Sequence, residues 1–187
     1  MQKDQTSFVS RAGFKLYFAL TNFKIEVKNK ICADFGASTG GFTDCLMQLG
    51  ASKVYSVDTS YGELAWKLRQ NPKVITLEKT NAIHVKLPEK ADLITNDTGW
   101  TKQEFVIPNI WENLKTNGIL LTLIKPHYEA SNLTKNGKLD EETALEITNK
   151  SVGKIENLGF KNLGIIKSPL VGKKGGNSEY IGYFIKI

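Results

Sequence analysis

The sequence has few of the residues that build disulfide scaffolds and metal centres. Its 187 residues include two cysteines, Cys32 and Cys45, and two histidines, His84 and His127. Both cysteines lie in apolar or helical patterns, so we expect them in the core rather than in a disulfide framework. The histidines are far apart, and no cluster has the spacing of metal ligands, so a metal-dependent enzyme is not expected.

Long apolar runs are missing as well. None approaches the ~18 residues of a membrane-spanning helix, so no membrane contact is expected. The first residues, MQKDQTSFVSRAG, contain neither an apolar stretch nor a small-residue cleavage site. Because a secretion signal needs both, we expect no such signal and a cytoplasmic location.

The composition favours a globular protein with an anionic partner. Apolar residues make up 41% of the chain, and its length suits one domain, which we expect to span residues 1–187. Lysine and arginine total 25 against 19 acids, for a net charge of +6. A basic surface of this kind favours nucleic acid, although many small basic proteins bind none.

Short apolar runs alternate with helical patterns along most of the chain. The expected strands are 31–35, 53–57, 73–77, 91–95, 119–124, 161–167 and 180–187, and the expected helices are 10–21, 42–49, 63–70, 103–115 and 140–158. Such alternation predicts an α/β fold with a mostly parallel sheet between helices. The last two strands have no helix between them and are expected to be antiparallel. Residues 1–29 are expected to form a helical segment packed on the domain, residues 129–138 a loop, and Trp66 and Trp111 part of the core.

A glycine-rich turn follows the first expected strand and opens a helix. Its spacing, Gly-x-x-x-Gly-Gly, differs from the dinucleotide fingerprint, and Asp34 precedes the glycines. A carboxylate there suits the ammonium of S-adenosylmethionine, and Asp58, which ends the second strand, suits ribose hydroxyls. Asn81 suits either the adenine edge or a turn. The candidate cofactor residues are Asp34, Gly36, Ala37, Ser38, Thr39, Gly40, Gly41, Phe42, Asp58, Asn81 and Asp97.

Charged residues follow other expected strands at the same edge. Asp97 follows the fourth strand, Lys125 the fifth, and Glu179 begins the antiparallel last strand, while Lys15 on the first helix can reach over this edge. Any one of these four residues, taken alone, is interpreted as an ordinary surface charge. Together, two lysines and two carboxylates suggest removal of a proton from a ribose hydroxyl that attacks a methyl group. A desolvated lysine beside another cation is expected to have a lowered pKa and to act as the base.

The chain resembles the TlyA-type (hemolysin A-like) ribosomal RNA ribose methyltransferases, within the FtsJ-like 2′-O-methyltransferases. The matching segments are VSRAGFKL from residue 9, DFGASTGGFTDCL from 34, VYSVDTSYGELAWKLR from 54, EKTN from 78, LIKP from 123 and GNSE from 176. The resemblance implies a seven-stranded Rossmann-like sheet with S-adenosylmethionine as methyl donor. It also implies a catalytic set at Lys15, Asp97, Lys125 and Glu179, with Lys125 as central base, acting on a 2′-hydroxyl of structured RNA.

Two departures from the family pattern concern the substrate. Relatives usually carry a small N-terminal RNA-binding module, whereas about eight residues precede the Ser-Arg segment here. RNA recognition is therefore expected from the domain's own charge, from a protein partner or from a homodimer. The relatives' Ser-Phe-Ile-Ser-like run is replaced by Thr-Gly-Trp-Thr after Asp97. The candidate RNA contacts are Arg11, Trp100, Lys102, Lys173 and Lys174.

Several alternatives remain at this point. Trp100 suits a stacked target base or ordinary packing, and the Lys173-Lys174 turn suits phosphate binding or simple solvation. Residues 96–100 weakly resemble the Asn-Pro-Pro-aromatic turn of amino-methyltransferases, which modify exocyclic amines and need no lysine base. A non-catalytic RNA-binding or assembly factor on a methyltransferase scaffold is the other rival.

Overall fold

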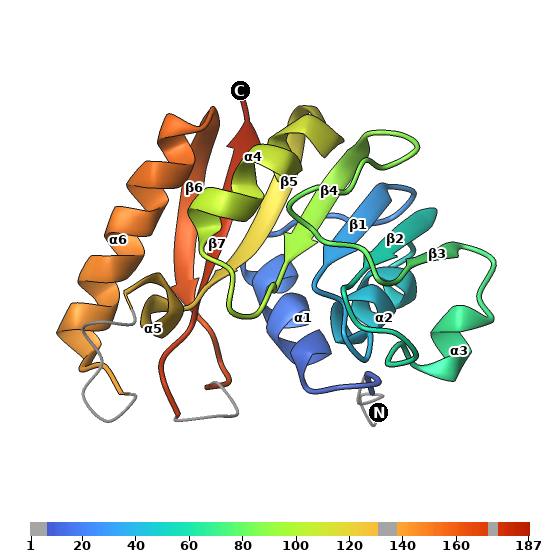
Figure 1. Ribbon diagram of the computed structural model, residues 1–187, viewed down its shortest axis with the longest axis horizontal. Helices are drawn as coiled ribbons and strands as arrows, with labels where there is room; N and C mark the ends of the chain where they lie inside the picture. Colours follow the sequence, from blue (N-terminus) through green and yellow to red (C-terminus); the bar gives the residue numbers. More distant parts are fainter. Residues whose placement is uncertain (1–6, 131–137, 172–175) are drawn as a thin grey trace.

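A computed structural model describes residues 7–130, 138–171 and 176–187. Its centre is one seven-stranded sheet with the strand order β3-β2-β1-β4-β5-β7-β6 (Figure 1). In chain order, the described strands are β1 (Ile31–Phe35), β2 (Lys53–Val57), β3 (Val74–Leu77), β4 (Ala91–Asn96), β5 (Leu114–Ile124), β6 (Phe160–Lys167) and β7 (Tyr180–Lys186).

The sheet is parallel except for one strand. β1 to β5 pair in parallel, whereas β7 lies antiparallel between β5 and β6. The start of β7 therefore lies at the same sheet edge as the carboxyl ends of β1 to β5, which is the lower edge in Figure 1. The chain order reverses between β1 and β4, and such a switch point is where open α/β sheets bind ligands. The predicted fold class and the antiparallel last strand are confirmed.

Helices cover both faces of the sheet. They are α1 (Ala12–Asn22), α2 (Gly41–Gln48), α3 (Trp66–Arg69), α4 (Gln103–Asn113), α5 (Pro126–Glu129) and α6 (Glu141–Asn157). One core cluster joins α4 and α6 to the near face in Figure 1, through residues such as Val106 and Ile155. The other joins α1 and α2 to the far face, through residues such as Leu16 and Leu46. Cys32 and Cys45 are buried in this second core.

Local details differ from the sequence patterns around α3 and α5. The helix expected over 63–70 is only Trp66–Arg69, because residues just before it form a loop in which Gly62 has a φ of 82°. Trp66 was wrongly expected in the core and is 70% exposed. The short helix α5 begins at Pro126, whose fixed φ suits a first helical position.

The described residues offer neither a membrane-spanning helix nor a cluster of metal ligands. Among residues 7–130, 138–171 and 176–187, no helix has the length and apolar character needed to cross a bilayer. Within the same ranges, no three or more His, Cys, Asp or Glu side chains are grouped so that they would hold a metal ion.

Candidate active site

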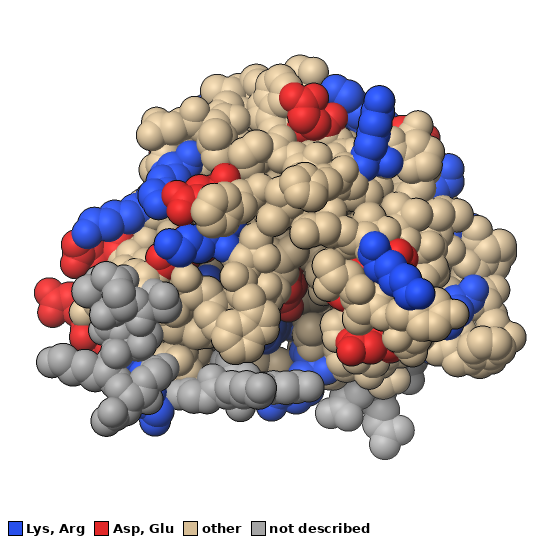
Figure 2. All heavy atoms as spheres, viewed as in Figure 1, with Lys and Arg blue, Asp and Glu red and all other residues tan. Residues whose placement is uncertain are grey.

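A cavity of about 740 Å³ opens at the carboxyl edge of the parallel strands. Figure 2 shows this hollow in the lower part of the near face, with acidic and basic atoms inside it. Its volume is within the usual range for small-molecule sites. The lining residues come from the loops after β1 to β5 and from the start of β7. They are Gly36, Ser38, Val57, Asp58, Thr59, Glu63, Thr80, Asn81, Ala82, Asp97, Thr98, Gly99, Trp100, Thr101, Lys125, His127, Tyr128 and Glu179.

Gly36 joins the two loops that form the middle of this cavity. A Cβ at Gly36 would lie 2.9 Å from the backbone carbon and oxygen of Asp97, and the φ of Gly36 is +83°. The backbone N–H of Asp97 also donates to the carbonyl of Phe35 at 2.9 Å. Glycine is therefore required here for the close approach of two backbones.

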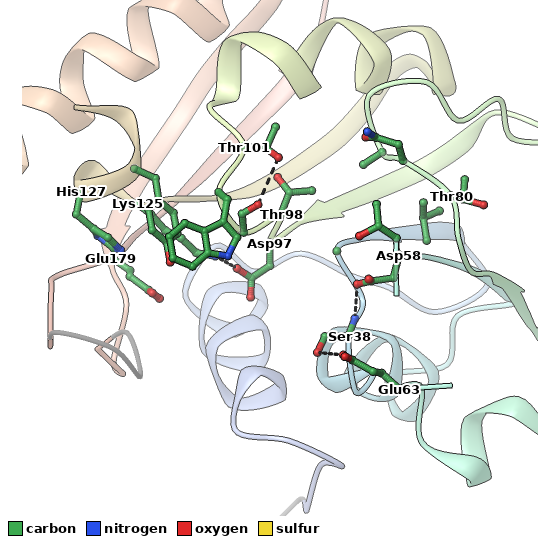
Figure 3. Close-up of a pocket in the computed structure, with 18 residues that line it drawn as sticks. Ser38, Asp58, Glu63, Thr80, Asp97, Thr98, Thr101, Lys125, His127 and Glu179 are labelled. Atoms are coloured by element: carbon green, nitrogen blue, oxygen red, sulfur yellow. Dashed lines mark hydrogen bonds and ion pairs between the residues drawn. The ribbon is translucent and has the colours of Figure 1, made fainter. Parts of the chain in front are cut away.

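Asp58 organises the other end of the cavity. Its Oδ2 accepts a hydrogen bond from the backbone N–H of Ser38 at 2.7 Å, and its Oδ1 accepts one from that of Ser60 at 2.8 Å. Figure 3 shows Asp58 beside Ser38, whose hydroxyl donates to Glu63. Each carboxylate oxygen can accept a further hydrogen bond, so Asp58 remains suited to a pair of ribose hydroxyls.

Asp34 lies beneath the cavity, where it is fully buried. Its Oδ2 accepts hydrogen bonds from the backbone N–H and hydroxyl of Thr43, and its Oδ1 accepts one from the hydroxyl of Thr95. Burial raises the pKa of Asp34 to about 7, although the hydrogen bonds from Thr43 and Thr95 act in the opposite direction. In this structure Asp34 holds the start of α2 against β1 and β4, and its contact with the ammonium group of a cofactor stays a prediction.

The rest of the glycine-rich turn lies toward α1. A smaller hollow of about 190 Å³ is lined by Ser10, Arg11, Ala12, Lys15, Gly36, Ala37, Ser38, Thr39, Phe42 and Asp97. A Cβ at Gly40 would meet Leu64 and Leu68, and one at Gly41 would meet Ser10 and the backbone of Gly13. Gly40 and Gly41 thus serve the packing of neighbouring segments, whereas Ala37, Thr39 and Phe42 line a hollow.

Two ion pairs bring together charges that are far apart in the sequence. Lys125 Nζ lies 2.5 Å from Asp97 Oδ1, and Lys15 Nζ lies 2.5 Å from Glu179 Oε2. Lys15 comes from α1 and Glu179 from the residue before β7, and both side chains are nearly buried. Asp97, Lys125 and Glu179 line the main cavity, while Asp97 and Lys15 line the smaller one. The four residues therefore meet at the boundary between the two hollows.

The charges around Lys125 correct the expected direction of its pKa. Burial by itself would lower the pKa of Lys125, as the sequence argument assumed. The attraction of the Asp97 carboxylate, 2.5 Å from Nζ, and of the nearby Glu179 carboxylate outweighs burial and raises the pKa of Lys125 above its ordinary value. Lys125 is therefore an ammonium at neutral pH in the protein without bound ligands.

A buried polar network fixes the backbone on which Asp97 and Lys125 sit. Asn96 Nδ2 donates to Thr122 Oγ1 at 2.9 Å and to Gln103 Oε1 at 3.3 Å. Gln103 Nε2 donates to the carbonyl of Leu123, and the backbone N–H of Gln103 donates to Glu129 Oε1. Because these bonds join β4, β5, α4 and α5, they hold the two strand ends in a defined relation.

An aromatic wall borders the cavity beside Lys125. Trp100 is 77% exposed, and its ring centroid lies 4.9 Å from that of Tyr128. Tyr128 also contacts His127, whose pKa is lowered by burial, so His127 is neutral at pH 7. The sequence analysis names Trp100 as a candidate RNA contact, with ordinary packing as the alternative, and does not name Tyr128. The signal for Tyr128 was its position three residues after Lys125 at a strand end.

The predicted RNA contacts lie in different places. Arg11 is exposed and lines the smaller hollow, and Lys102 is the residue before α4. Asn81 lines the main cavity, where its side-chain oxygen accepts a turn hydrogen bond from the N–H of Ile83. Lys173 and Lys174 lie outside the described residues.

Comparison with known proteins gives a family. A sequence profile described as FtsJ-like methyltransferase matches residues 8–186. The chain belongs to the FtsJ-like methyltransferase family. The chain is 40% identical over 185 residues to Hemolysin A of Brachyspira hyodysenteriae, which covers 95% of this chain and 77% of that protein. It is 34% identical over 187 residues to the 16S/23S rRNA (cytidine-2′-O)-methyltransferase TlyA of Mycobacterium tuberculosis, over 94% of this chain and 68% of TlyA.

A solved structure agrees over nearly the whole chain. It is described as a "putative hemolysin" from Streptococcus thermophilus and superposes with a TM-score of 0.93 at 31% identity, over 99% of this chain and 69% of that one. A Bacillus subtilis relative with the name "Putative rRNA methyltransferase YqxC" is 35% identical, and the chain spans 64% of its length.

Membership in this family makes the protein a methyltransferase and S-adenosylmethionine its cofactor. The residues present fit that group. Asp58 at one end of the cavity offers acceptors to ribose hydroxyls. At the other end, Thr98 Oγ1 is buried without a protein partner among the described residues and lies on the cavity wall. A buried polar atom of this kind is usually satisfied by a ligand or a water.

Proposed function

We propose that this protein methylates a ribose 2′-hydroxyl of ribosomal RNA, with Lys15, Asp97, Lys125 and Glu179 around the reacting oxygen. The observation that carries the proposal is the meeting of two lysine–carboxylate pairs at the boundary of the cavity. The names of the TlyA relatives, which specify cytidine-2′-O methylation, favour the same substrate class.

The cofactor would occupy the cavity between Asp58 and Asp97. Asp58 would accept hydrogen bonds from the ribose hydroxyls, and the backbone from Gly36 to Ser38 would line the path between the two ends. When bound, S-adenosylmethionine supplies an electrophilic methyl group. Asp34 acts as a positioning residue, because its hydrogen bonds to Thr43 and Thr95 fix the turn from below.

The four charged residues would bind and deprotonate the attacking hydroxyl. A hydroxyl becomes a better nucleophile as it loses its proton, and a positioned base supplies typically 10²–10⁴-fold in rate. Lys125 is the group proposed to take that proton, and it does so only from its neutral form. Asp97 holds the Lys125 amine at 2.5 Å, while the Lys15–Glu179 pair fixes two more hydrogen-bonding groups beside it.

The aromatic wall would hold the target nucleotide. Trp100 stands largely exposed at the cavity and is braced by Tyr128, so one face of its indole is free to stack on a base. Lys125 lies 5.7 Å from the centre of the Tyr128 ring, which places the wall next to the reactive amine. A base stacked there would bring its own ribose toward Lys125.

The test is methylation of purified 16S and 23S rRNA with isotopically labelled S-adenosylmethionine, followed by digestion and identification of the labelled nucleoside. We expect label on a ribose 2′-oxygen, and a loss of about 100-fold or more in Lys125→Ala. Lys115→Ala is the matched control, because Lys115 lies near the other end of β5 and pairs with an aspartate, Asp92, at 2.8 Å. It should leave the rate unchanged.

Two results would overturn the proposal. Label on a base amine that persists in Lys125→Ala would indicate an amino-methyltransferase, which needs no lysine base. RNA binding with no methyl transfer by the wild-type protein would indicate a binding or assembly factor.

A further inference from the structure

Exposed aromatic side chains gather on the outer side of α1, next to the site. Phe14 is 46% exposed and Tyr17 is 38% exposed, and both lie on the helix that carries Lys15. Phe8 packs against both, with ring centroids 5.1 Å from Phe14 and 6.1 Å from Tyr17. We call Phe8, Phe14 and Tyr17, together with Arg11, the α1 aromatic surface.

This surface is held in place by its surroundings. A Cβ at Gly13 would lie 2.4 Å from the Phe8 ring, so glycine allows that ring to lie directly on the helix. The residues around Phe8 are tied to α2, because the backbone N–H of Val9 donates to Asp44 Oδ2 and Gln48 Nε2 donates to the carbonyl of Ser7. Rings fixed in this way lose little conformational freedom when they bind a ligand.

The charge of the segment favours an anionic partner. Residues 8–25 contain no aspartate or glutamate, and of their three cations Arg11 and Lys24 are exposed, while Lys15 is buried and paired with Glu179. Aromatic rings interleaved with cations are the pattern of surfaces that stack bases and contact phosphates of single-stranded nucleic acid. A specific protein interface needs about 20–30 residues on each side, and three rings among cations do not provide such a patch.

The α1 aromatic surface is also continuous with the reactive end of the site. Arg11 lines the smaller hollow together with Lys15 and Asp97, and Phe14 is the neighbour of Lys15 in the chain. An RNA strand whose target ribose lies at Lys125 would therefore pass next to the α1 aromatic surface.

We propose that the α1 aromatic surface binds single-stranded RNA that flanks the target nucleotide, by stacking bases on Phe14 and Tyr17 while Arg11 contacts the backbone. This inference rests on the proposed function, which identifies the bound RNA as the methylation substrate. It adds a second contact region, on α1, to the aromatic wall at Trp100.

The experiment measures the affinity of the full chain for an oligocytidylate of about 12 nucleotides and for 23S rRNA, with S-adenosylmethionine binding as a check of the fold. Phe14→Leu/Tyr17→Leu keeps the apolar bulk and removes the π faces. We expect it to bind the oligonucleotide about tenfold more weakly, because stacking needs a ring, and to bind the cofactor normally. Leu145→Ala/Leu163→Ala is the matched control, since both leucines are exposed apolar residues, on α6 and β6.

RNA affinity equal to wild type in the double leucine variant would overturn the inference. So would a wild-type protein that self-associates through this surface, with dimers lost in Phe14→Ala/Tyr17→Ala and kept in the leucine variant. Because binding is measured without methyl transfer, failure of the proposed function would be seen separately, as absence of ribose label with wild-type protein.

Discussion

The same two neighbouring strands carry an aspartate–lysine pair at each end. At the amino end of β4 and the start of β5, Asp92 pairs with Lys115 at 2.8 Å. At their carboxyl ends, Asp97 pairs with Lys125 at 2.5 Å. The first pair is solvated, with 46% of the Lys115 side chain and 29% of the Asp92 side chain exposed, against 13% for Lys125 and 19% for Asp97.

The difference between the two pairs lies in what surrounds them. Asp92 accepts a further hydrogen bond from the backbone N–H of Ile31, so it also joins β4 to the start of β1. The Asp97–Lys125 pair instead faces a cavity and lies near a second carboxylate, Glu179. Identical side chains at the two ends of the same strands therefore serve cohesion at one edge and, in the proposed function, chemistry at the other edge, which holds the cavity's loops.

The largest expected effect compares the two aspartates. Asp97→Asn should lower ribose methylation by about 100-fold or more, because the amide no longer holds the Lys125 amine as a carboxylate does. Asp92→Asn should leave the rate within about twofold, because its pair lies at the opposite edge of the sheet. Single-turnover rates on rRNA, with cofactor saturating, provide the measurement. Similar losses in both variants would mean that the two pairs act alike, through stability.

The sequence was sufficient for most of the fold. Alternating apolar runs and helical patterns predicted the strands to within one residue, except that β5 begins at Leu114 rather than at the expected residue 119. The lack of a helix between the last two expected strands predicted that the last strand is antiparallel. Around α3 the pattern failed, because Trp66 follows helical spacing but no neighbouring element covers it. Burial depends on which segments pack together, and periodicity along one segment does not contain that information.

The candidate site was predictable in part for a similar reason. Strand ends of a parallel sheet share one edge, so Asp97, Lys125 and Glu179 could be placed together from their positions alone. The pairing of Lys15 with Glu179 and the raised pKa of Lys125 depend on distances across the fold, which the sequence does not give. Asp34 shows the same limit, since a strand-end acid can point into the cavity or, as here, into the protein.

The second prediction uses pH to compare the pairs. Because Asp97 and Glu179 raise the pKa of Lys125, only a small fraction of this amine is neutral at pH 7. As long as the pH stays below that pKa, each increase of one pH unit raises the neutral fraction about tenfold. If Lys125 is the base, the methyl-transfer rate should rise with a slope near one in log rate against pH between about 7 and 9. Lys115→Ala should show the same slope. A flat profile would remove Lys125 from the role of base and leave it a binding group.

The smallest expected effect is on the free energy of unfolding, through the Asp92–Lys115 pair at the amino end of β4. Burial acts to raise the pKa of Asp92, but hydrogen bonds from Lys115 and the Ile31 amide hold it below the ordinary value. A lowered folded-state pKa means that this stabilisation is present above the unfolded pKa of about 3.9 and is lost as pH falls below it. Because the pair is solvated, Asp92→Asn should cost only about 0.5–1 kcal/mol at pH 7, and the gap from wild type should close toward pH 3. Urea unfolding at several pH values measures that gap. A gap that persists at pH 3 would show that the side chain acts through its shape and its bond to Ile31 rather than through its charge.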